Sequence, residues 1–480
     1  MKALLKMSPR ETVRNARSTR LRVVFSLLAG LVCQGAARGQ DQAAAALPQP
    51  RIVQSYLYGY APVTLEATRA LQTAVPDATM PGRAPINQFA YRNTLATPDE
   101  RLVVRPNADT LYTTAWLDLA REPMILHVPD TAGRYYLIPM LDAYSNEFAS
   151  IGSRTTGDGE GNYAIVGPRW NGFMPENVSG VIHSPTDTVW LLGRTLVNGE
   201  SDLAGAAGVV NQYKLVPLSA YPDFLATGAY EPPTNVPVTP PSPDFIGEPI
   251  GSAPGFSKPE FFDALARYAL ENPAPREQLA PASALVLYGF FNQNQLTAEV
   301  VSEADSAALN EILSTGIHEN GWSFNPNVGS YGTNYLLRAA VARFGLGANS
   351  SADAIYADAA KDGANIPLVG TSSYVIHFAP GQTPPARGFW SLTVYDADGF
   401  LVRNPINRYE VGSQTGLVSN SDGSVDIFLQ NTAPHTLSSN WLPTPAAPFT
   451  LTLRIYWPDQ SVLGGAWIPP AVNSVNAPLP

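Results

Sequence analysis

The stretch that decides the fold runs from Val104 to Arg154. It contains Asn107-Ala-Asp-Thr-Leu-Tyr112, Arg134-Tyr-Tyr136 and Asp142-Ala-Tyr-Ser-Asn146, set between runs of apolar residues. Short runs rich in β-branched and aromatic residues, separated by Pro, Gly, Asn and Asp, are typical of strands joined by turns. The stretch therefore predicts a sheet that carries a cluster of polar groups able to do chemistry.

The same pattern extends on both sides of this stretch and predicts a β-rich domain over residues 40–230. Its strands are expected at 101–105, 110–119, 124–128, 134–142, 163–166 and 188–195. A helix is expected at 62–75, where Pro62 stands near the start of an apolar periodicity. A second helix is expected at 202–213. Both are interpreted as peripheral to the sheets.

Residues 231–256 form a Pro-rich linker that contains Pro240-Pro-Ser-Pro243. Such a sequence cannot be a regular helix or a central strand, so we expect a semi-rigid crossing between domains. Amphipathic patterns then predict a helical region over 257–362, with helices at 257–271, 275–298, 305–317 and 334–344.

The last part of the chain, 363–480, returns to strand-like alternation. Strands are expected at 374–378, 389–395, 425–429 and 450–457, with hairpin-like turns at Asp396-Ala-Asp-Gly399 and Ser421-Asp-Gly423. This spacing favours an antiparallel sandwich or jelly roll. The predicted fold class is mostly β with helices (α+β): two antiparallel β-rich domains with a helical region between them.

The first 39 residues have the pattern of a signal peptide. A basic segment precedes the apolar run 23–33, which is too short for a membrane span, and Ala37-Arg-Gly39 favours cleavage that leaves Gln40 first. Removal of this segment lowers Lys plus Arg from 30 to 22 and Asp plus Glu from 40 to 39, a net charge of −17. Such a charge disfavours nucleic acid and anionic lipid as partners.

A resemblance to the domain of unknown function DUF1254 is carried by Asn107-Ala-Asp-Thr-Leu-Tyr-Thr-Thr-Ala-Trp-Leu-Asp-Leu, His127-Val-Pro-Asp and Gly133-Arg-Tyr-Tyr. A resemblance to its usual companion, DUF1214, is carried by Gly388-Phe-Trp-Ser-Leu-Thr-Val-Tyr-Asp-Ala-Asp-Gly-Phe-Leu-Val-Arg-Asn, Ser439-Asn-Trp-Leu-Pro and Leu453-Arg-Ile-Tyr-Trp-Pro. The two resemblances bracket almost the whole mature chain. They imply two β-rich domains with helices between them in an exported bacterial protein, and they bring no catalytic mechanism.

The candidate site lies in the opening stretch. Asp109, Asp142 and Tyr112 are the candidate catalytic residues, because two carboxylates and a phenol can perform acid–base chemistry and paired carboxylates serve glycoside hydrolysis. The candidate substrate-binding residues are Asn107, Arg134, Tyr144, Asn146 and Arg154. The alternative is structural: Asn107 and Asp109 would cap a turn after Pro106, and the arginines would form ion pairs with Asp109 or Asp142.

Cofactor and metal motifs are not expected. The five histidines are scattered, and the only cysteine, Cys33, is lost with the signal segment, so a zinc site is disfavoured. There is no P-loop, dinucleotide fingerprint or Gly-x-Ser-x-Gly elbow. The turns at Asp396-Ala-Asp-Gly399 and Asp158-Gly-Glu-Gly161 resemble parts of calcium loops, but turn chemistry explains them better.

Two functional hypotheses follow. The first is an exported, periplasmic or secreted enzyme of hydrolase type that acts on a small polar or carbohydrate-like substrate without metal, cofactor or cysteine nucleophile. The second is a non-catalytic envelope or ligand-binding protein. In either case we expect a homo-oligomer, because large β-sandwich proteins often bury apolar surface between copies.

Overall fold

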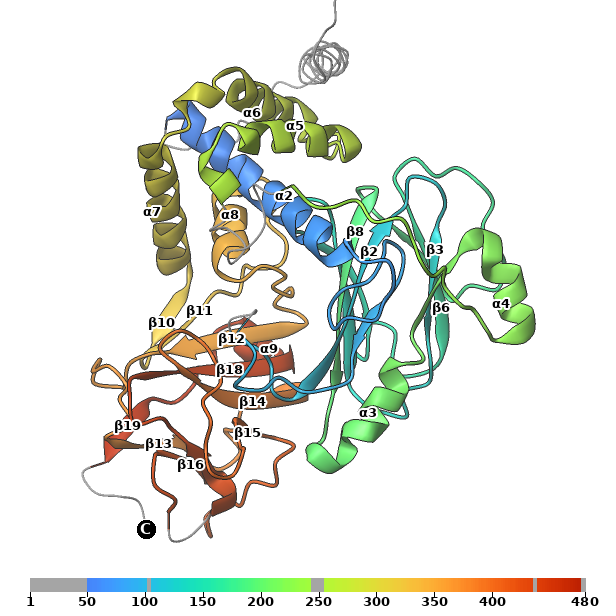
Figure 1. Cartoon of the computed structure of the whole chain (residues 1–480). Helices are drawn as coiled ribbons and strands as arrows, with labels where there is room; N and C mark the ends of the chain where they lie inside the picture. Colours follow the sequence, from blue (N-terminus) through green and yellow to red (C-terminus); the bar gives the residue numbers. More distant parts are fainter. Residues whose placement is uncertain (1–49, 102–104, 243–253, 435–437, 476–480) are drawn as a thin grey trace, which may run out of the picture.

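The computed structural model describes residues 50–101, 105–242, 254–434 and 438–475. Two β-sandwich domains and a layer of helices pack around one another (Figure 1). The predicted α+β fold class is confirmed. The predicted signal segment lies outside the described residues, as do residues 102–104 of the strand expected at 101–105 and residues 243–253 of the Pro-rich linker.

The N-terminal sandwich consists of a five-stranded and a four-stranded sheet. The first has the order β1-β2-β8-β4-β5, with bounds Ala90–Arg92, Thr110–Asp118, Thr188–Leu196, Tyr136–Leu141 and Glu147–Gly152. The second has the order β7-β6-β3-β9, with bounds Gly180–His183, Gly161–Val166, Met124–Val128 and Lys214–Pro217. Alternate residues such as Leu111, Leu126 and Ile138 fill the core between them. The short helices α3 (Leu203–Val210) and α4 (Tyr221–Thr227) flank this domain.

The C-terminal sandwich is built from a six-stranded and a four-stranded sheet. The larger has the order β10-β11-β12-β18-β14-β15, with bounds Ile317–Glu319, Trp322–Phe324, Ala354–Ala359, Phe449–Pro458, Ala386–Asp396 and Glu410–Gly412. The smaller has the order β17-β16-β13-β19, with bounds Trp441–Pro443, Val425–Gln430, Ser373–Phe378 and Val472–Val475. A short helix, α9 (Gln460–Leu463), follows β18.

Two details of the sheets differ from expectation. The larger C-terminal sheet starts before residue 363, because β12 pairs along its length with β18 and β11 pairs with β12. Neither sandwich is purely antiparallel, since β6 and β7 run parallel and so do β16 and β17. The strand predicted at 124–128 coincides with β3.

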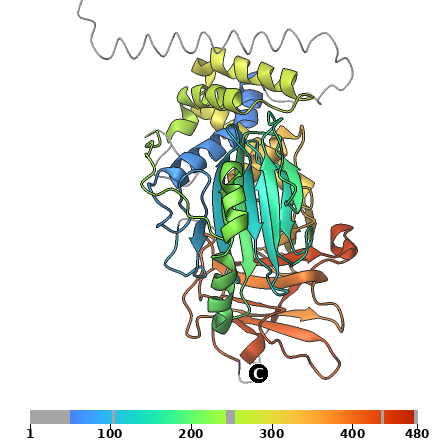
Figure 2. The same cartoon turned by 90° about the vertical axis from the view of Figure 1, so that its right-hand side faces the viewer.

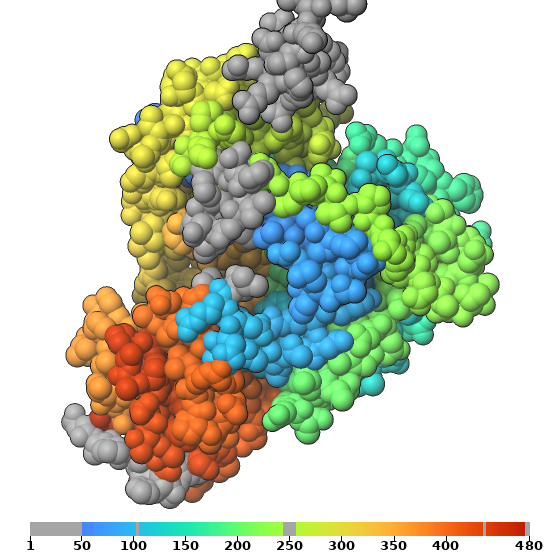
Figure 3. Space-filling view, in the orientation of Figure 1, coloured from blue at the N-terminus to red at the C-terminus, as the bar shows by residue number. Residues whose placement is uncertain are grey.

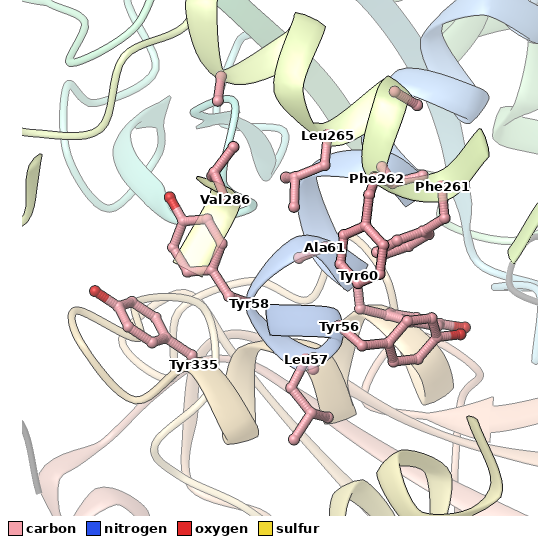
Figure 4. Close-up of a cluster of buried hydrophobic side chains, with 14 of the residues drawn as sticks. Tyr56, Leu57, Tyr58, Tyr60, Ala61, Phe261, Phe262, Leu265, Val286 and Tyr335 are labelled. Atoms are coloured by element: carbon pink, nitrogen blue, oxygen red, sulfur yellow. The ribbon is translucent and has the colours of Figure 1, made fainter. Parts of the chain in front are cut away.

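The helical layer is organised around α2 (Arg51–Thr73). It packs against α5 (Glu260–Glu271), α6 (Leu279–Phe291), α7 (Ala298–Thr315) and α8 (Tyr335–Phe344). Tyr56 and Tyr60 of α2 lie with Phe261 and Phe262 of α5 in one aromatic cluster (Figure 4). Seen from the side, the layer covers one end of the N-terminal sandwich, with the C-terminal sandwich at the opposite end (Figure 2).

Helix α2 begins eleven residues before the predicted start at Pro62, which lies inside the helix. Proline has no N–H, so the carbonyl of Tyr58, one turn earlier, loses its helical donor. Arg338 of α8 replaces that donor, with its Nη2 at 2.9 Å from the Tyr58 oxygen. Its guanidinium also lies over the rings of Tyr58, Tyr144 and Tyr335, 4.8 to 5.4 Å from their centroids. The proline is tolerated because tertiary packing supplies the missing hydrogen bond.

Helix α2 also ties the layer to the N-terminal sandwich. Leu65 packs against Trp116 and Trp190, whose rings are stacked 5.0 Å apart on the outer face of the five-stranded sheet. In the space-filling view the blue N-terminal segment lies between the helical layer, the C-terminal domain and the N-terminal sandwich (Figure 3). No helix in the described parts of the chain has the length and apolar character needed to cross a membrane.

Candidate active site

The candidate site begins with the alternation of residues along β14 and β18. Trp390, Leu392 and Val394 of β14 enter the core of the C-terminal sandwich. The residues between them face the other way, which in an antiparallel sheet is ordinarily the solvent side. Here that side is polar and buried, as Ser391 and Arg454 show with 2% and 3% exposure. The N-terminal sandwich covers it.

We call the resulting group the interdomain polar cluster. From the N-terminal sandwich and its adjoining loop it contains Asn107, Asp109, Tyr112 and Arg194; from the C-terminal sandwich it contains Tyr356, Ser391, Thr393, Tyr395, Glu410, Arg454 and Tyr456. Beside it the two domains meet through apolar side chains, with Tyr135 and Leu196 packed against Phe389.

The loop that carries Asp109 is held in place by the C-terminal domain. The Tyr395 hydroxyl donates to the Pro106 carbonyl at 2.7 Å, and Nη2 of Arg454 donates to the Arg105 carbonyl at 2.9 Å. Asn107 donates from Nδ2 to the Tyr456 hydroxyl at 2.8 Å. The position of Asp109 therefore depends on both domains being assembled.

Asp109 is buried and its charge is poorly compensated. It is 5% exposed, and neither of its carboxylate oxygens meets full hydrogen-bond geometry with a partner among the described residues, although the Ser391 and Asn107 side chains lie close enough to lower its pKa. Burial raises its pKa, against the opposing influence of the Ser391 hydroxyl and the Arg454 guanidinium. The Ser391 hydroxyl, which faces Asp109, likewise makes no hydrogen bond of full geometry within the described part of the chain. A buried carboxylate in this state is costly to the fold, and such groups concentrate at functional sites.

Glu410 on β15 is the second carboxyl of the cluster. Burial, and secondly the neighbouring Asp109 carboxylate, raise the pKa of Glu410 to about 8. Its residue nevertheless keeps partial exposure to solvent. Two carboxyl groups that repel each other in a dry setting resist ionising together, so the Asp109 charge favours the protonated form of Glu410. This arrangement can give a proton from one carboxyl and accept a proton at the other.

The structure brings together three of the predicted site residues: Asn107, Asp109 and Tyr112. It separates Asp142 from them. Thr110 pairs with Leu196 at one end of β8, whereas Leu141 pairs with Trp190 six residues further along, about 20 Å away at strand spacing. The expectation that Asp142 would lie on a strand next to Asp109 is wrong, because β8 lies between β2 and β4.

Asp142 organises a turn. Its Oδ1 accepts hydrogen bonds from the backbone N–H groups of Tyr144 and Asn146 at 2.8 and 2.9 Å. Tyr144 enters the helical layer, where its hydroxyl donates to the Asn272 carbonyl. The Asn146 side chain donates from Nδ2 to the Asp142 carboxylate and accepts the Tyr331 N–H at its Oδ1. These three predicted site residues fasten the turn to the helices.

The two predicted arginines form ion pairs, but with carboxylates other than those expected. Arg134 binds Asp202, beside the start of α3. Arg154 binds Asp353 of the C-terminal domain, with Nε at 2.5 Å and Nη2 at 2.9 Å from its oxygens. Neither pairs with Asp109 or Asp142. Arg134 precedes β4 and Arg154 follows β5, and β8 separates both of these strands from β2.

A second carboxyl pair, Glu147 with Asp353, also joins the two domains. Burial and then Asp353 raise the pKa of Glu147 to about 8. All four oxygens are engaged: Glu147 accepts from the N–H and hydroxyl of Ser350, and Asp353 accepts from Arg154, Ser150 and Ser350. This pair is saturated and acts as an interdomain fastening, whereas the Asp109 oxygens have no donor in the described residues.

Sequence reasoning missed the C-terminal half of the cluster, including Glu410, Arg454 and Tyr456, and also Arg194. A signal was present in the strands, since Arg454 stands in Leu451-Thr-Leu-Arg-Ile-Tyr456 and Arg194 in Val189-Trp-Leu-Leu-Gly-Arg194. Charged residues are rarely buried unless they are paired, so an arginine within an apolar strand indicates a polar environment in the fold.

Metal ligands do not converge in the described ranges, where no group of three or more His, Cys, Asp or Glu side chains is arranged to hold an ion. In the turn at 396–400, Oδ1 of Asp396 accepts the backbone N–H groups of Asp398 and Phe400. The carboxylate is used by its own turn.

Comparison with known families and structures agrees with this architecture. Residues 86–217 match the family model described as a protein of unknown function (DUF1254), and residues 353–460 match the one described as a protein of unknown function (DUF1214). The chain belongs to this two-domain DUF1254/DUF1214 family. The first match contains Asn107, Asp109 and Tyr112, and the second contains Glu410 and Arg454.

The solved structures that are similar to this chain include the following two. The crystal structure of the VPA0106 protein from Vibrio parahaemolyticus is 22% identical, with a TM-score of 0.59 over 89% of this chain and 99% of that one. A putative uncharacterised protein from Burkholderia cenocepacia is 13% identical, with a TM-score of 0.44 over 94% and 96% of the two chains. The first likeness shows a shared fold. A search of curated proteins gave no match.

Proposed function

We propose that the protein is an acid–base enzyme of hydrolase type that acts on a small polar or carbohydrate-like substrate at the interdomain polar cluster. Asp109 and Glu410 carry the proton transfers, and Tyr112 lines the site. The observation that supports this most is the buried Asp109 carboxylate, whose two oxygens have no partner in the described residues although its charge raises the pKa of a second carboxyl, that of Glu410. A merely structural carboxylate would be expected to be saturated, as Asp353 is.

In the proposed reaction Glu410 begins protonated and Asp109 begins ionised. Glu410 gives its proton to the leaving oxygen of the substrate as the bond to that oxygen breaks. Asp109 takes a proton from the attacking water, whose oxygen forms the new bond. Afterwards the proton of the pair is on Asp109 instead of Glu410, and its return to Glu410 restores the starting state. Arg454, hydrogen-bonded to Thr393 and Tyr395, holds positive charge beside Asp109 throughout.

The alternative function is that of a non-catalytic ligand-binding or envelope protein. It is favoured by one observation: the same cluster positions the loop 105–109 between the domains through Tyr395, Arg454 and Tyr456. The two functions differ in what they require of Glu410. Catalysis requires the residue to be protonated, and domain assembly does not.

The pH dependence of hydrolysis tests the proposal. The mature protein would be assayed against chromogenic glycosides and carboxylic esters across neutral and alkaline pH. Because Glu410 must be protonated, the rate should fall as the pH rises through about 8, the pKa of that group. A rate that continues to rise through this range, or a hydrolysis with the same profile in Glu410→Gln, would contradict the proposed role.

We also propose that the protein is exported to the periplasm or secreted, and that it forms a homo-oligomer. Export is supported by the basic and apolar pattern of residues 1–39. Assembly is supported by apolar side chains such as Leu313 and Phe344, which are 52% and 46% exposed on the helical layer. N-terminal sequencing of exported protein should begin at Gln40, and light scattering should give a mass above that of one chain.

A further inference from the structure

The interdomain polar cluster contains one buried arginine from each sandwich. Arg194 comes from β8 and Arg454 from β18, with 7% and 3% exposure. A buried guanidinium is normally matched by a carboxylate or phosphate, because an uncompensated charge in a dry setting is costly. Arg194 and Arg454 have no such partner within ion-pair distance among the described residues.

The hydrogen bonds of both arginines go to neutral acceptors. Arg194 donates to the Leu192 and Gly347 carbonyls and to Oδ1 of Asn349. Arg454 donates to the Arg105 carbonyl, the Thr393 hydroxyl and the Tyr395 hydroxyl. Neither forms an ion pair with a carboxylate of the described chain. These bonds use three of the five N–H groups of each guanidinium, and Arg194 also interacts with the Tyr112 hydroxyl.

A continuous path of contacts joins the two arginines. Asn349 accepts from Arg194 and donates from Nδ2 to the Tyr356 hydroxyl at 2.8 Å. Tyr356 is the direct cross-strand neighbour of Arg454, which places their side chains on the same face. Tyr112 lies under Arg194, 5.6 Å from guanidinium carbon to ring centroid. Tyr112 and Tyr356 both keep partial exposure, so solvent reaches this part of the cluster.

We propose that Arg194 and Arg454 bind a carboxylate group of the ligand beside Tyr112 and Tyr356. Arg194 has no carboxylate within ion-pair distance in the described residues, and Arg454 is influenced by the Asp109 charge without forming an ion pair with it. Both guanidinium groups can therefore take an anionic partner, and a guanidinium fork matches the two oxygens of a carboxylate. A phosphate dianion is disfavoured relative to a carboxylate. The Asp109 and Glu410 carboxyls lie in the same cluster and repel the additional negative charge that the dianion carries. This inference rests on the proposed function, since it assigns the acidic part of the substrate that the carboxyl pair would process.

Calorimetric titration of the mature protein with benzoate tests the inference, with benzamide as the neutral isostere and inorganic phosphate as the dianion. Benzoate should bind, and benzamide and phosphate should bind at least about tenfold more weakly, the effect of losing one charge-assisted interaction. Arg194→Lys and Arg454→Lys keep the charge but lose the fork, so each should weaken benzoate binding about tenfold. Arg169→Lys, on a surface arginine paired with Asp187, is the matched control and should bind as the parent does.

Thermal melting identifies any variant that fails to fold, and either arginine variant that folds is sufficient for the test. Asp109→Asn should leave benzoate binding unchanged or tighter, because it removes a competing negative charge, although the proposed function requires it to abolish turnover. If the benzoate effects hold and Asp109→Asn remains active, the anion site stands and the proposed catalysis fails. If benzoate does not bind, or binds equally to Arg194→Lys and Arg454→Lys as to the parent, the anion site is overturned.

Discussion

Asp109→Asn and Glu410→Gln will each lower turnover by roughly 10²- to 10⁴-fold, the usual contribution of a positioned acid or base. The amide introduced in place of the Asp109 carboxylate cannot accept a proton from water. The amide introduced in place of the Glu410 carboxyl cannot supply a proton to a leaving group. Both substitutions conserve shape, so the loss should appear in kcat. The rate would be measured on whichever chromogenic substrate the parent hydrolyses.

Two further observations make this prediction specific. Asp142→Asn is the matched control, because Asp142 is also buried, at 4% exposure, but is saturated by its own turn. It should keep turnover within severalfold of the parent while it weakens the turn. Asp109→Asn should melt at the same temperature as the parent or higher, since it removes a buried carboxylate that has no donor. Equal turnover in all three variants would contradict the proposed pair.

Arg338→Met will lower the free energy of unfolding by about 3 kcal/mol, the sum of a lost hydrogen bond to a buried carbonyl and lost cation–π contacts. Methionine fills much of the volume but cannot donate to the Tyr58 oxygen, which Pro62 already leaves without a helical donor. Urea unfolding followed by tryptophan fluorescence would measure the change.

The proline provides a compensating substitution. Pro62→Ala restores an N–H one turn after Tyr58, so in the Arg338→Met background it should recover part of the lost stability. Arg343→Met on the same helix is the control, because Arg343 makes a partly exposed pair with Asp305 at 3.6 Å and lies 5.8 Å from the ring centroid of the exposed Phe344, so the change should cost under about 1 kcal/mol. If Arg338→Met costs no more than Arg343→Met, the explanation for the buried proline fails.

Local patterns in the sequence predict most of the elements but not their partners. The alternation at 389–395 and 450–457 predicts strands, and β14 and β18 contain those residues. The start of α2 could not be predicted because Pro62 disfavours an interior helical position, and its tolerance depends on Arg338, 276 positions away in the chain. A propensity rule cannot anticipate a donor supplied by tertiary packing.

Only the N-terminal half of the candidate site was predicted, because the C-terminal half joins it through tertiary packing. Asn107, Asp109 and Tyr112 stand together in one motif, so a local signal identifies them. Pairing Asp109 with Asp142 required the strand order, which places β8 between β2 and β4. Glu410 and Arg454 come near enough to influence Asp109 only when one sandwich covers the polar face of the other. No local pattern in the sequence of either domain predicts that docking.

The central claim is that Asp109 and Glu410 share one proton between the two domains. Infrared difference spectroscopy measures it directly, because protonated carboxyl and carboxylate groups absorb at different frequencies. The comparison would use the Glu147→Gln protein with and without Glu410→Gln. The Glu147 carboxyl, whose pKa is also about 8, would otherwise titrate in the same range. The account predicts a carboxyl band at neutral pH that titrates near pH 8 and is missing in Glu410→Gln. Identical spectra with and without Glu410 across that range would contradict it.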